Sequence, residues 1–231
     1  MSENWTKEDI KILEKYYPSI GARVQEFLPE RSKSSISHKA SRLGISYKDL
    51  CDGKIGFFDI ETTGLNADFA WMYSWAIKTL GEDETYYAVV TQDEIREGIL
   101  DQRIIEELVE TLKKYKRIYT YYGSRFDVPF ARTRALFHNL DFVPYGLVEH
   151  RDLYYLVRRI LKLHRRRLEN VCDILGVTGK THLEPRIWVM ANTGDEESLE
   201  YILDHNIKDV LILERVYKRL QEFEAKTRRY L

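Results

Sequence analysis

The stretch GFFDIETTGL, residues 56–65, places two acids inside an otherwise apolar segment. Asp59 and Glu61 alternate with Phe58 and Ile60, which is the two-residue period of a β-strand. Residues two apart on a strand point to the same side, so both carboxylates lie on one face, within about 7 Å of each other along the chain. Burying a carboxylate without a partner costs several kcal/mol. A central strand with this sequence therefore needs positive charge from elsewhere in the fold.

The composition is that of an ordered globular protein. The chain has 231 residues, 44% of them hydrophobic, enough for one full domain and a small additional unit. Cys51 and Cys172 form no CxxC pair and are expected to be reduced thiols. The N-terminus has no apolar signal segment, and no run approaches the ~18 apolar residues of a membrane span. We therefore expect a soluble cytoplasmic protein without a membrane partner.

Charge is segregated along the chain, although the formal net charge is only -1. Residues 31–48 and residues 158–167 are each rich in Lys and Arg and contain no acid. Acidic residues are concentrated around 93–110 and 195–204. Basic runs of this kind suit phosphate binding on selected faces, and a solvated helix face is the alternative interpretation.

Residues 1–48 have the pattern of a separate unit of three short helices. The first helix is expected to end at Pro18 and the second at Pro29. The third is expected to begin near Ser32 and to end at Gly44, a residue common just after a helix.

Residues 54–231 follow a hinge at 47–54 and have the pattern of an α/β domain. Strands are expected at 55–60, 71–80, 85–91, 117–122 and 147–150, and helices at 99–114, 126–138 and about 199–226. Three strands in an antiparallel pattern, followed by alternating helices and strands, predict a mixed sheet flanked by helices.

Two further acids and a histidine occur where they can meet Asp59 and Glu61. Asp127, in YGSRFDVPF, follows a strand and opens a helix, and His205 and Asp209, in HNIKDV, lie one turn apart on the last helix. Clusters of carboxylates suit Mg²⁺ or Mn²⁺. Two such ions can stabilise the attacking and leaving oxygens of a displacement at phosphorus. Bound metal would supply the charge that the strand carboxylates lack.

In this order and at these separations, FFDIETTGL, YGSRFDVPF and HNIKDV resemble the three motifs of the ribonuclease H-like DEDD 3′–5′ exonuclease superfamily. The resemblance covers roughly residues 56–217 and implies a ribonuclease H-like fold. It implies that Asp59, Glu61, Asp127 and Asp209 are the metal-binding acids, with two Mg²⁺ or Mn²⁺ ions as cofactors. It also implies hydrolysis of phosphodiester bonds from a 3′ end by metal-activated water.

Two positions depart from the superfamily pattern. The third motif combines the histidine of one branch with the spacing of another, and it is most similar to a predicted-exonuclease branch with the motif His-Asn-x-x-Asp-Val. We expect His205 to orient or deprotonate the attacking water, because an imidazole titrates near neutral pH. Tyr122 stands in the second motif where many relatives carry Asn, a change that affects contacts with the substrate end and leaves the acids intact.

The loop after the first strand has two interpretations. Thr62, Thr63 and Gly64 are either ordinary turn residues or, as the resemblance implies, a loop whose backbone approaches the terminal nucleotide. Phe126 is either a core residue or a wall of the site.

The N-terminal segments WTKEDIKILEKYYP and RSKSSISHKASRLGI resemble Myb/SANT-type and related helix-turn-helix domains that bind DNA. Trp5 matches their first core tryptophan, and Phe27 and Ile36 are expected to replace the later ones. The resemblance implies that the third helix enters the major groove. Its candidate phosphate or base contacts are Lys33, Ser35, His38, Lys39 and Arg42. The alternative is a packing or protein-interaction module.

The second basic run supplies Arg165 and Arg166 as candidates for tracking a nucleic-acid backbone. The sequence thus predicts a helical nucleic-acid-binding module followed by a two-metal 3′–5′ exonuclease. The preferred partner is DNA, with single-stranded 3′ ends at the catalytic domain and duplex at the N-terminal module. RNA stays open, because the motifs contain no signal of a 2′-hydroxyl contact. The alternatives are a structure-specific endonuclease or ribonuclease on the same metal core, and a DNA-binding regulator with an inactive nuclease fold.

Overall fold

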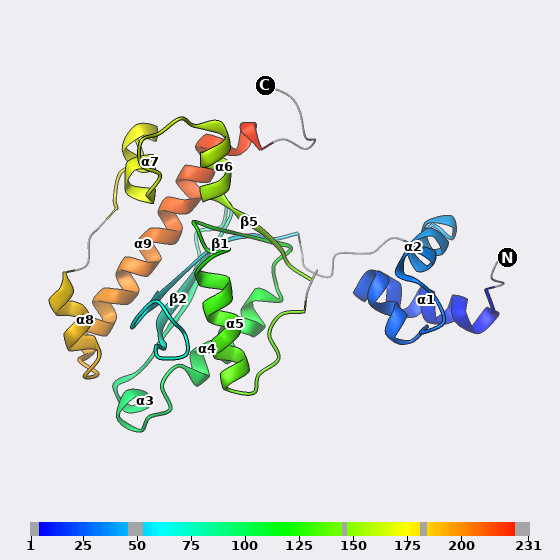
Figure 1. Ribbon diagram of the computed structural model, residues 1–231, viewed down its shortest axis with the longest axis horizontal. Coiled ribbons are helices and arrows are strands. Elements are labelled where there is room, and N and C mark those ends of the chain that lie inside the picture. The colour runs from blue at the N-terminus through cyan, green and yellow to red at the C-terminus, as the bar shows by residue number, and fades with distance from the viewer. Residues whose placement is uncertain (1–4, 46–52, 145–146, 181–183, 225–231) are drawn as a thin grey trace. The chain divides into compact units, whose positions relative to one another are not determined.

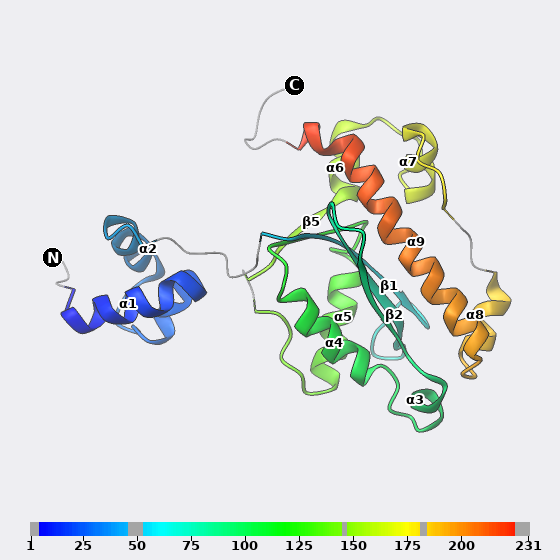
Figure 2. The same cartoon turned by 180° about the vertical axis from the view of Figure 1, so that it is seen from behind.

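The computed structural model describes residues 5–45, 53–144, 147–180 and 184–224. The chain divides into two units, Met1–Gly53 and Lys54–Leu231. Residues 47–52 of the expected hinge, Cys51 among them, lie outside the described residues. In chain order, Figures 1 and 2 show α1 (Lys7–Ile20), η1 (Gly21–Glu26), α2 (Lys33–Arg42), β1 (Ile55–Thr62), β2 (Met72–Thr79), β3 (Thr85–Val89), α3 (Gln92–Arg96), α4 (Gln102–Leu112), β4 (Arg117–Thr120), α5 (Asp127–Phe137), β5 (Glu149–Asp152), α6 (Leu153–Ile160), α7 (Leu168–Leu175), α8 (Pro185–Ala191), α9 (Glu196–Leu220) and η2 (Gln221–Phe223).

The first unit has its own small apolar core. The first helix does not end at Pro18 as expected, because α1 continues for two residues to Ile20, and a proline this close to a helix end disturbs only its last turn. The segment that follows is a 3-10 helix, and α2 begins after Ser32, whose Oγ accepts a hydrogen bond from Ser35 N (3.1 Å). Phe27 was expected in the core but is 48% exposed and stacks on Tyr16. The buried core residues are Leu13, Val24, Leu28, Ile36 and Ala40.

The second unit is built on a five-stranded mixed sheet of order β3-β2-β1-β4-β5. Strands β3, β2 and β1 pair antiparallel, whereas β1, β4 and β5 pair parallel. The predicted mixed sheet flanked by helices is confirmed, with β1 in the middle. Asp59 lies opposite Ala76 and Glu61 opposite Ser74, and the register shifts directly after Glu61.

Helices cover both faces of this sheet (Figures 1 and 2). Phe57 packs in one apolar cluster with residues of α6, α7 and α9, whereas Phe58 and Ile60 pack in the other with residues of α4 and α5. Because side chains alternate along a strand, Asp59 and Glu61 share the face of Phe57. The two acids therefore point toward α9.

The long helix α9 begins three residues before its expected start. Asp195 caps it by accepting a hydrogen bond from Ser198 N (3.0 Å), and the last α-helical residue is Leu220. The α-helix thus ends before the expected residue 226, because residues 221–223 continue as the 3-10 helix η2. No described helix, α9 included, has the combined length and apolar character that crossing a membrane requires.

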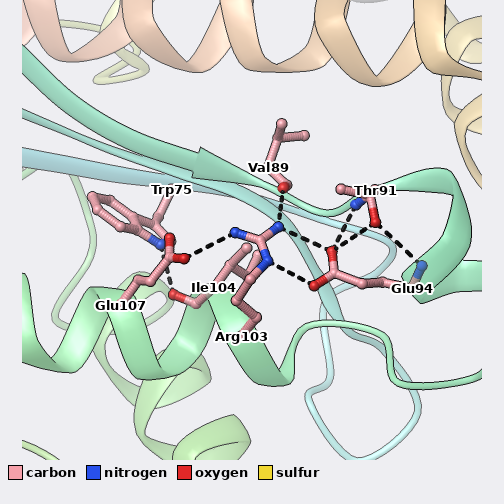
Figure 3. Close-up of polar contacts among 7 residues, drawn as sticks. All are labelled: Trp75, Val89, Thr91, Glu94, Arg103, Ile104 and Glu107. Atoms are coloured by element: carbon pink, nitrogen blue, oxygen red, sulfur yellow. Dashed lines mark hydrogen bonds and ion pairs between the residues drawn. The ribbon is translucent and has the colours of Figure 1, made fainter.

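An unexpected short helix, α3, fastens the edge strand β3 to α4 (Figure 3). Thr91 and Glu94 form a capping box at its start. Arg103 of α4 donates to Glu94 (2.7 Å), to the carbonyl of Val89 (2.8 Å) and to Glu107 (3.0 Å). One arginine thus joins β3, α3 and α4.

A fully buried acid, Asp101, ties α4 to α5 and to β2. It accepts two hydrogen bonds from Arg134, at 2.8 and 2.7 Å, and one from Met72 N at 2.9 Å. His138 Nε2 lies 2.7 Å from the same carboxylate. Arg134 also donates to the carbonyl of Ala67, in the loop after β1 (3.3 Å). This ion group therefore anchors the loop that leads away from Asp59 and Glu61.

Replacing Arg134 with Ala is expected to lower the free energy of unfolding by about 3–5 kcal/mol, because Asp101 would remain buried with most of its compensation removed. The matched change Arg103→Ala, at a side chain that is 41% exposed, should cost about 1 kcal/mol or less. Chemical denaturation followed by near-UV circular dichroism measures both. Equal losses for the two variants would contradict the assignment of Asp101 as a buried ion anchor.

Candidate active site

Three elements bring the sequence-predicted acids and the histidine to one place. Strand β1 contributes Asp59 and Glu61, α5 begins at Asp127, and α9 contributes His205 and Asp209. Asp127 Oδ1 accepts a hydrogen bond from the amide of Ile60 (3.3 Å), which joins the start of α5 to β1 between the two strand acids. The structure therefore gathers all five residues from segments far apart in sequence.

His205 lies between two of the acids. Its Nε2 is 3.6 Å from Glu61 Oε1 and 3.7 Å from Asp209 Oδ2. One ligand atom from each of these three residues lies within 4.8 Å of the others. The three-residue gap between His205 and Asp209 is one helical turn, so both side chains reach the same point from one face of α9.

Sequence reasoning missed Asn206, which holds Asp59 in position. Asn206 Nδ2 donates to Asp59 Oδ2 (2.8 Å), and Asn206 Oδ1 accepts from Ser74 Oγ (3.2 Å). Asn206 is fully buried. The sequence did contain a signal for Asn206. It lies in the motif HNIKDV three residues before Asp209, and residues three apart on a helix share a face.

Lys180 was missed as well, and it supplies the nearest positive charge. Its ammonium forms an ion pair with Asp209 Oδ2 from the segment after α7, and the lysine side chain is 22% exposed. No sequence pattern connects this segment to α9.

The protonation behaviour of the acids reflects their crowding. Burial, followed by the nearby Asp127 and Asp209, raises the pKa of Asp59 well above its usual range. Burial and the charge of Asp209 raise the pKa of Glu61 to about 8, although Lys180 opposes this shift. Burial raises the pKa of Asp127 to about 7. The folded chain thus holds protons on carboxyl groups that are ordinarily ionised at neutral pH.

The loop residues predicted to contact nucleic acid lie at the end of β1. Thr62 Oγ1 donates to the carbonyl of Gly64 (2.8 Å), and Thr63 Oγ1 accepts from Trp71 N (3.0 Å), so both hydroxyls help to close the loop. Phe126 packs at an angle against Phe130 (5.6 Å between centroids). It also lines a hollow of about 230 Å³ together with residues of the same loop.

Arg165 and Arg166 are the remaining predicted nucleic-acid contacts of the second unit. Arg165 is exposed, and the carbonyl of Arg166 accepts a hydrogen bond from Tyr121 (2.5 Å). In the first unit, the candidate side chains lie on or beside the solvent-facing side of α2. Lys33, His38 and Arg42 are exposed, Ser35 is half-buried, and the ammonium of half-buried Lys39 lies 5.9 Å from the ring of Trp5.

The raised pKa values predict how the stability of the metal-free protein depends on pH. Between the ordinary carboxyl values of 4.5 for Glu61 and 3.8 for Asp127 and the raised values of about 8 and about 7, the folded state binds more protons than the unfolded state. The free energy of unfolding should therefore fall as pH rises through this window. With a chelator present, Glu61→Gln should flatten this fall and stabilise the protein at about pH 8 by about 1 kcal/mol or more.

Urea denaturation at about pH 5 and about pH 8 measures this effect. Glu106→Gln, at an exposed acid on α4, is the matched control and should leave the pH dependence unchanged. A Glu61→Gln variant as pH-sensitive as the parent chain would contradict the crowding of the carboxylates.

Comparison with known proteins gives matches over part of this chain. The chain is 32% identical to a DNA polymerase of Methanocaldococcus jannaschii over 123 residues, which is 45% of this chain and 8% of the polymerase. It is 35% identical over 71 residues to an uncharacterized protein of Listeria innocua, covering 29% of this chain and 93% of that protein. The chain therefore spans less than a tenth of the polymerase's length.

The fold is similar to part of a solved structure. In the family B DNA polymerase of the hyperthermophilic archaeon Pyrobaculum calidifontis, the match has a TM-score of 0.57 at 19% identity and covers 71% of this chain and 24% of the polymerase chain. A family model described as RNase_H superfamily matches residues 56–221, more than half of the chain. With a mixed five-stranded sheet and acids gathered at β1, the chain belongs to the RNase H superfamily.

Proposed function

We propose that residues 54–231 form a metal-dependent 3′–5′ exonuclease of the DEDD type, which hydrolyses phosphodiester bonds of nucleic acid by a two-metal mechanism. The observation that carries this proposal is the grouping of four carboxylates beside β1: Asp127, Asp209 and Glu61 all act electrostatically on Asp59. Ligand atoms of Glu61 and Asp209 lie within 4.8 Å of each other and of His205. The raised pKa values of Asp59, Glu61 and Asp127 reflect burial with too little positive charge nearby, and Lys180 is a cation that opposes the shift at Asp59 and Glu61. A cationic ligand would relieve that deficit.

The donor atoms fit a hard divalent cation. Asp209 Oδ1 is buried and has no hydrogen-bond partner among the described residues, although its other oxygen is paired with Lys180. Carboxylate oxygens are the ligands that Mg²⁺ and Mn²⁺ prefer. The four acids would hold two such ions, whose charge stabilises the attacking and leaving oxygens of a displacement at phosphorus.

The remaining side chains have roles in positioning and proton transfer. His205, one turn before Asp209, would orient the attacking water or accept its proton, because its imidazole lies close to Glu61 and Asp209 and imidazole is a common general base. Asn206 fixes the orientation of Asp59. The backbone of residues 62–64 and the ring of Phe126 would contact the terminal nucleotide, and Arg165 and Arg166 would contact phosphates.

DNA is the preferred substrate. The proteins similar to this chain include two DNA polymerases, matched over a small part of their lengths. RNA is the alternative substrate that the same acids would cut, because the two-metal reaction does not involve the 2′ position.

Single-stranded DNA labelled at its 5′ end should be shortened one nucleotide at a time in the presence of Mg²⁺ or Mn²⁺. Asp59→Asn should abolish this activity, because it removes a metal-binding charge. Asn206→Ala should reduce it by about 10- to 100-fold, the usual effect of losing a group that orients a metal ligand. The matched control is Asp204→Asn on the exposed side of α9, which should retain full activity.

Two further substrates complete the assay: a circular single-stranded DNA, and a linear RNA of the same sequence as the linear DNA. We expect no cleavage of the circle, because it has no 3′ end. Internal cuts in the circle would replace the exonuclease with an endonuclease, and the absence of any cleavage of linear DNA or RNA would overturn the enzymatic proposal.

We further propose that residues 1–48 are a Myb/SANT-like helix-turn-helix module that binds duplex DNA through α2. Lys33, His38 and Arg42 of α2 are exposed, while Ile36 and Ala40 on its other side are buried in the core of the unit. Trp5 packs beneath the basic side chains of Arg31 and Lys39. These contacts support a rigid helix with a basic outer face, which suits phosphate contacts.

Replacing both Lys33 and Arg42 with Ala should weaken duplex binding and reduce the slope of log affinity against log salt by roughly 1 to 2, because two phosphate contacts are lost. Fluorescence anisotropy at several salt concentrations measures this slope. Lys7→Ala combined with Lys11→Ala removes the same charge from exposed positions of α1 and is the matched control. If both double variants show the slope of the parent chain, α2 is not the binding helix.

A further inference from the structure

Three tyrosines form a continuous aromatic cluster beside the start of α5. Tyr122 meets Tyr154 with ring centroids 4.9 Å apart and planes at 75°, and Tyr154 meets Tyr155 at 5.3 Å and 88°. Tyr122 is 46% exposed and Tyr155 is 37% exposed. Aromatic rings are usually buried, because burial removes their large apolar area from water. The exposed rings of this cluster therefore leave apolar surface that a ligand can contact.

Tyr122 has an unfavourable backbone conformation. Its φ is 67°, in the left-handed region that glycine and asparagine tolerate and bulky residues rarely adopt. Asp152 holds this turn in place, because its carboxylate accepts hydrogen bonds from Tyr122 N (2.8 Å), Ser124 N (3.0 Å) and Tyr154 N (3.0 Å). The same carboxylate thus fixes both Tyr122 and the helix that carries Tyr154 and Tyr155. Strain that the surrounding structure maintains in this way is typical of functional sites.

The cluster adjoins the acids through a single residue. Gly123 packs so closely that a Cβ there would lie 2.7 Å from Asp127 Oδ2 and 2.5 Å from Thr120 Cβ. Tyr122 is its neighbour, one Cα–Cα step of about 3.8 Å away. The backbone that carries Tyr122 therefore runs beside the carboxylate of Asp127.

Basic groups flank the tyrosines. Arg125, which is exposed, donates to the hydroxyl of Tyr155 (3.3 Å). Tyr121 packs edge-on against Tyr154 (6.0 Å) and donates to the carbonyl of Arg166, which connects the cluster to the basic segment 158–167. The guanidinium of Arg125 therefore lies beside the exposed ring of Tyr155.

We propose that Tyr122, Tyr154, Tyr155 and Arg125 form a stacking surface for unpaired nucleobases, on which the last nucleotides of a single strand lie before the 3′ end reaches Asp127. This inference rests on the proposed exonuclease function and names its substrate form. Rings with accessible faces bind bases whatever their identity, and adjacent arginines bind the phosphates. Paired bases inside a duplex cannot stack on the rings, so the surface selects single strands or frayed ends, of DNA or of RNA.

Tyr122→Asn and Tyr122→Phe separate stacking from folding. Asn is comfortable at a left-handed φ, so Tyr122→Asn removes the ring and should melt no lower than the parent chain. Tyr122→Phe keeps the ring. Tyr87→Leu, at a tyrosine that is 53% exposed on the edge strand β3, is the matched control.

The probe is a single strand of roughly 12 nucleotides, in DNA and RNA forms, with 2-aminopurine near its 3′ end, mixed with the full chain in chelator so that no hydrolysis occurs. The fluorescence of this base reports stacking locally, independently of binding to the first unit. We expect Tyr122→Asn to weaken binding at the labelled end by about 5- to 100-fold and to abolish the fluorescence change. Tyr122→Phe and Tyr87→Leu should both match the parent chain.

Unchanged binding and fluorescence in Tyr122→Asn, or an equal loss in Tyr87→Leu, would overturn the stacking surface while leaving the exonuclease proposal intact. Hydrolysis of the same strand with Mg²⁺ or Mn²⁺ is measured separately. If the parent chain stacks the labelled base but hydrolyses neither DNA nor RNA, the stacking surface stands and the exonuclease proposal fails.

Discussion

The burial of several carboxyl groups close together beside β1 is the constraint on which the rest of the second unit depends. The strand stays in place because it is packed on both faces, with Phe57 in the cluster that includes α9 and Phe58 in the cluster that includes α4 and α5. These contacts hold Asp59 and Glu61 against α9 although burial raises both pKa values. Acids that are held in fixed positions with strongly raised pKa values are typical of functional sites. A ligand of opposite charge would stabilise their ionised form.

In the same unit, Asp101 is a buried acid whose negative charge is fully compensated by its neighbours. Asp101 accepts hydrogen bonds from Nε and Nη2 of Arg134 and from a backbone amide, and a histidine lies against it. Four acids near β1 have Lys180 as their nearest ammonium, and Asp209 retains a buried oxygen without a partner among the described residues. The shortage of positive charge is therefore confined to the acids beside β1 and is not a general property of the fold. Asn206 orients Asp59 without adding charge, so it preserves the geometry and leaves the shortage in place.

Much of this arrangement is predictable from the sequence. Alternation identified β1 and the shared face of Asp59 and Glu61, and one helical turn joined His205 to Asp209. Local signals also existed for α3, because Thr91 and Glu94 have the spacing of a capping box, but the preceding strand pattern obscured it. Lys180 could not be predicted, since a long-range contact between a loop and a helix leaves no periodic trace. The left-handed φ of Tyr122 was hidden for a related reason, because Asp152, thirty residues later, imposes it.

The binding of divalent cations by the gathered acids is tested most directly by calorimetric titration of the full chain with Mn²⁺. Glu61 and Asp127 carry protons near neutral pH that a cation must displace. Titration near pH 7 in two buffers of different ionisation enthalpy should therefore give saturable binding with release of protons, and Asp209→Asn should lose most of both signals. If the parent chain binds no Mn²⁺, or binds it as Asp209→Asn does and releases no proton, the acids are not a metal site.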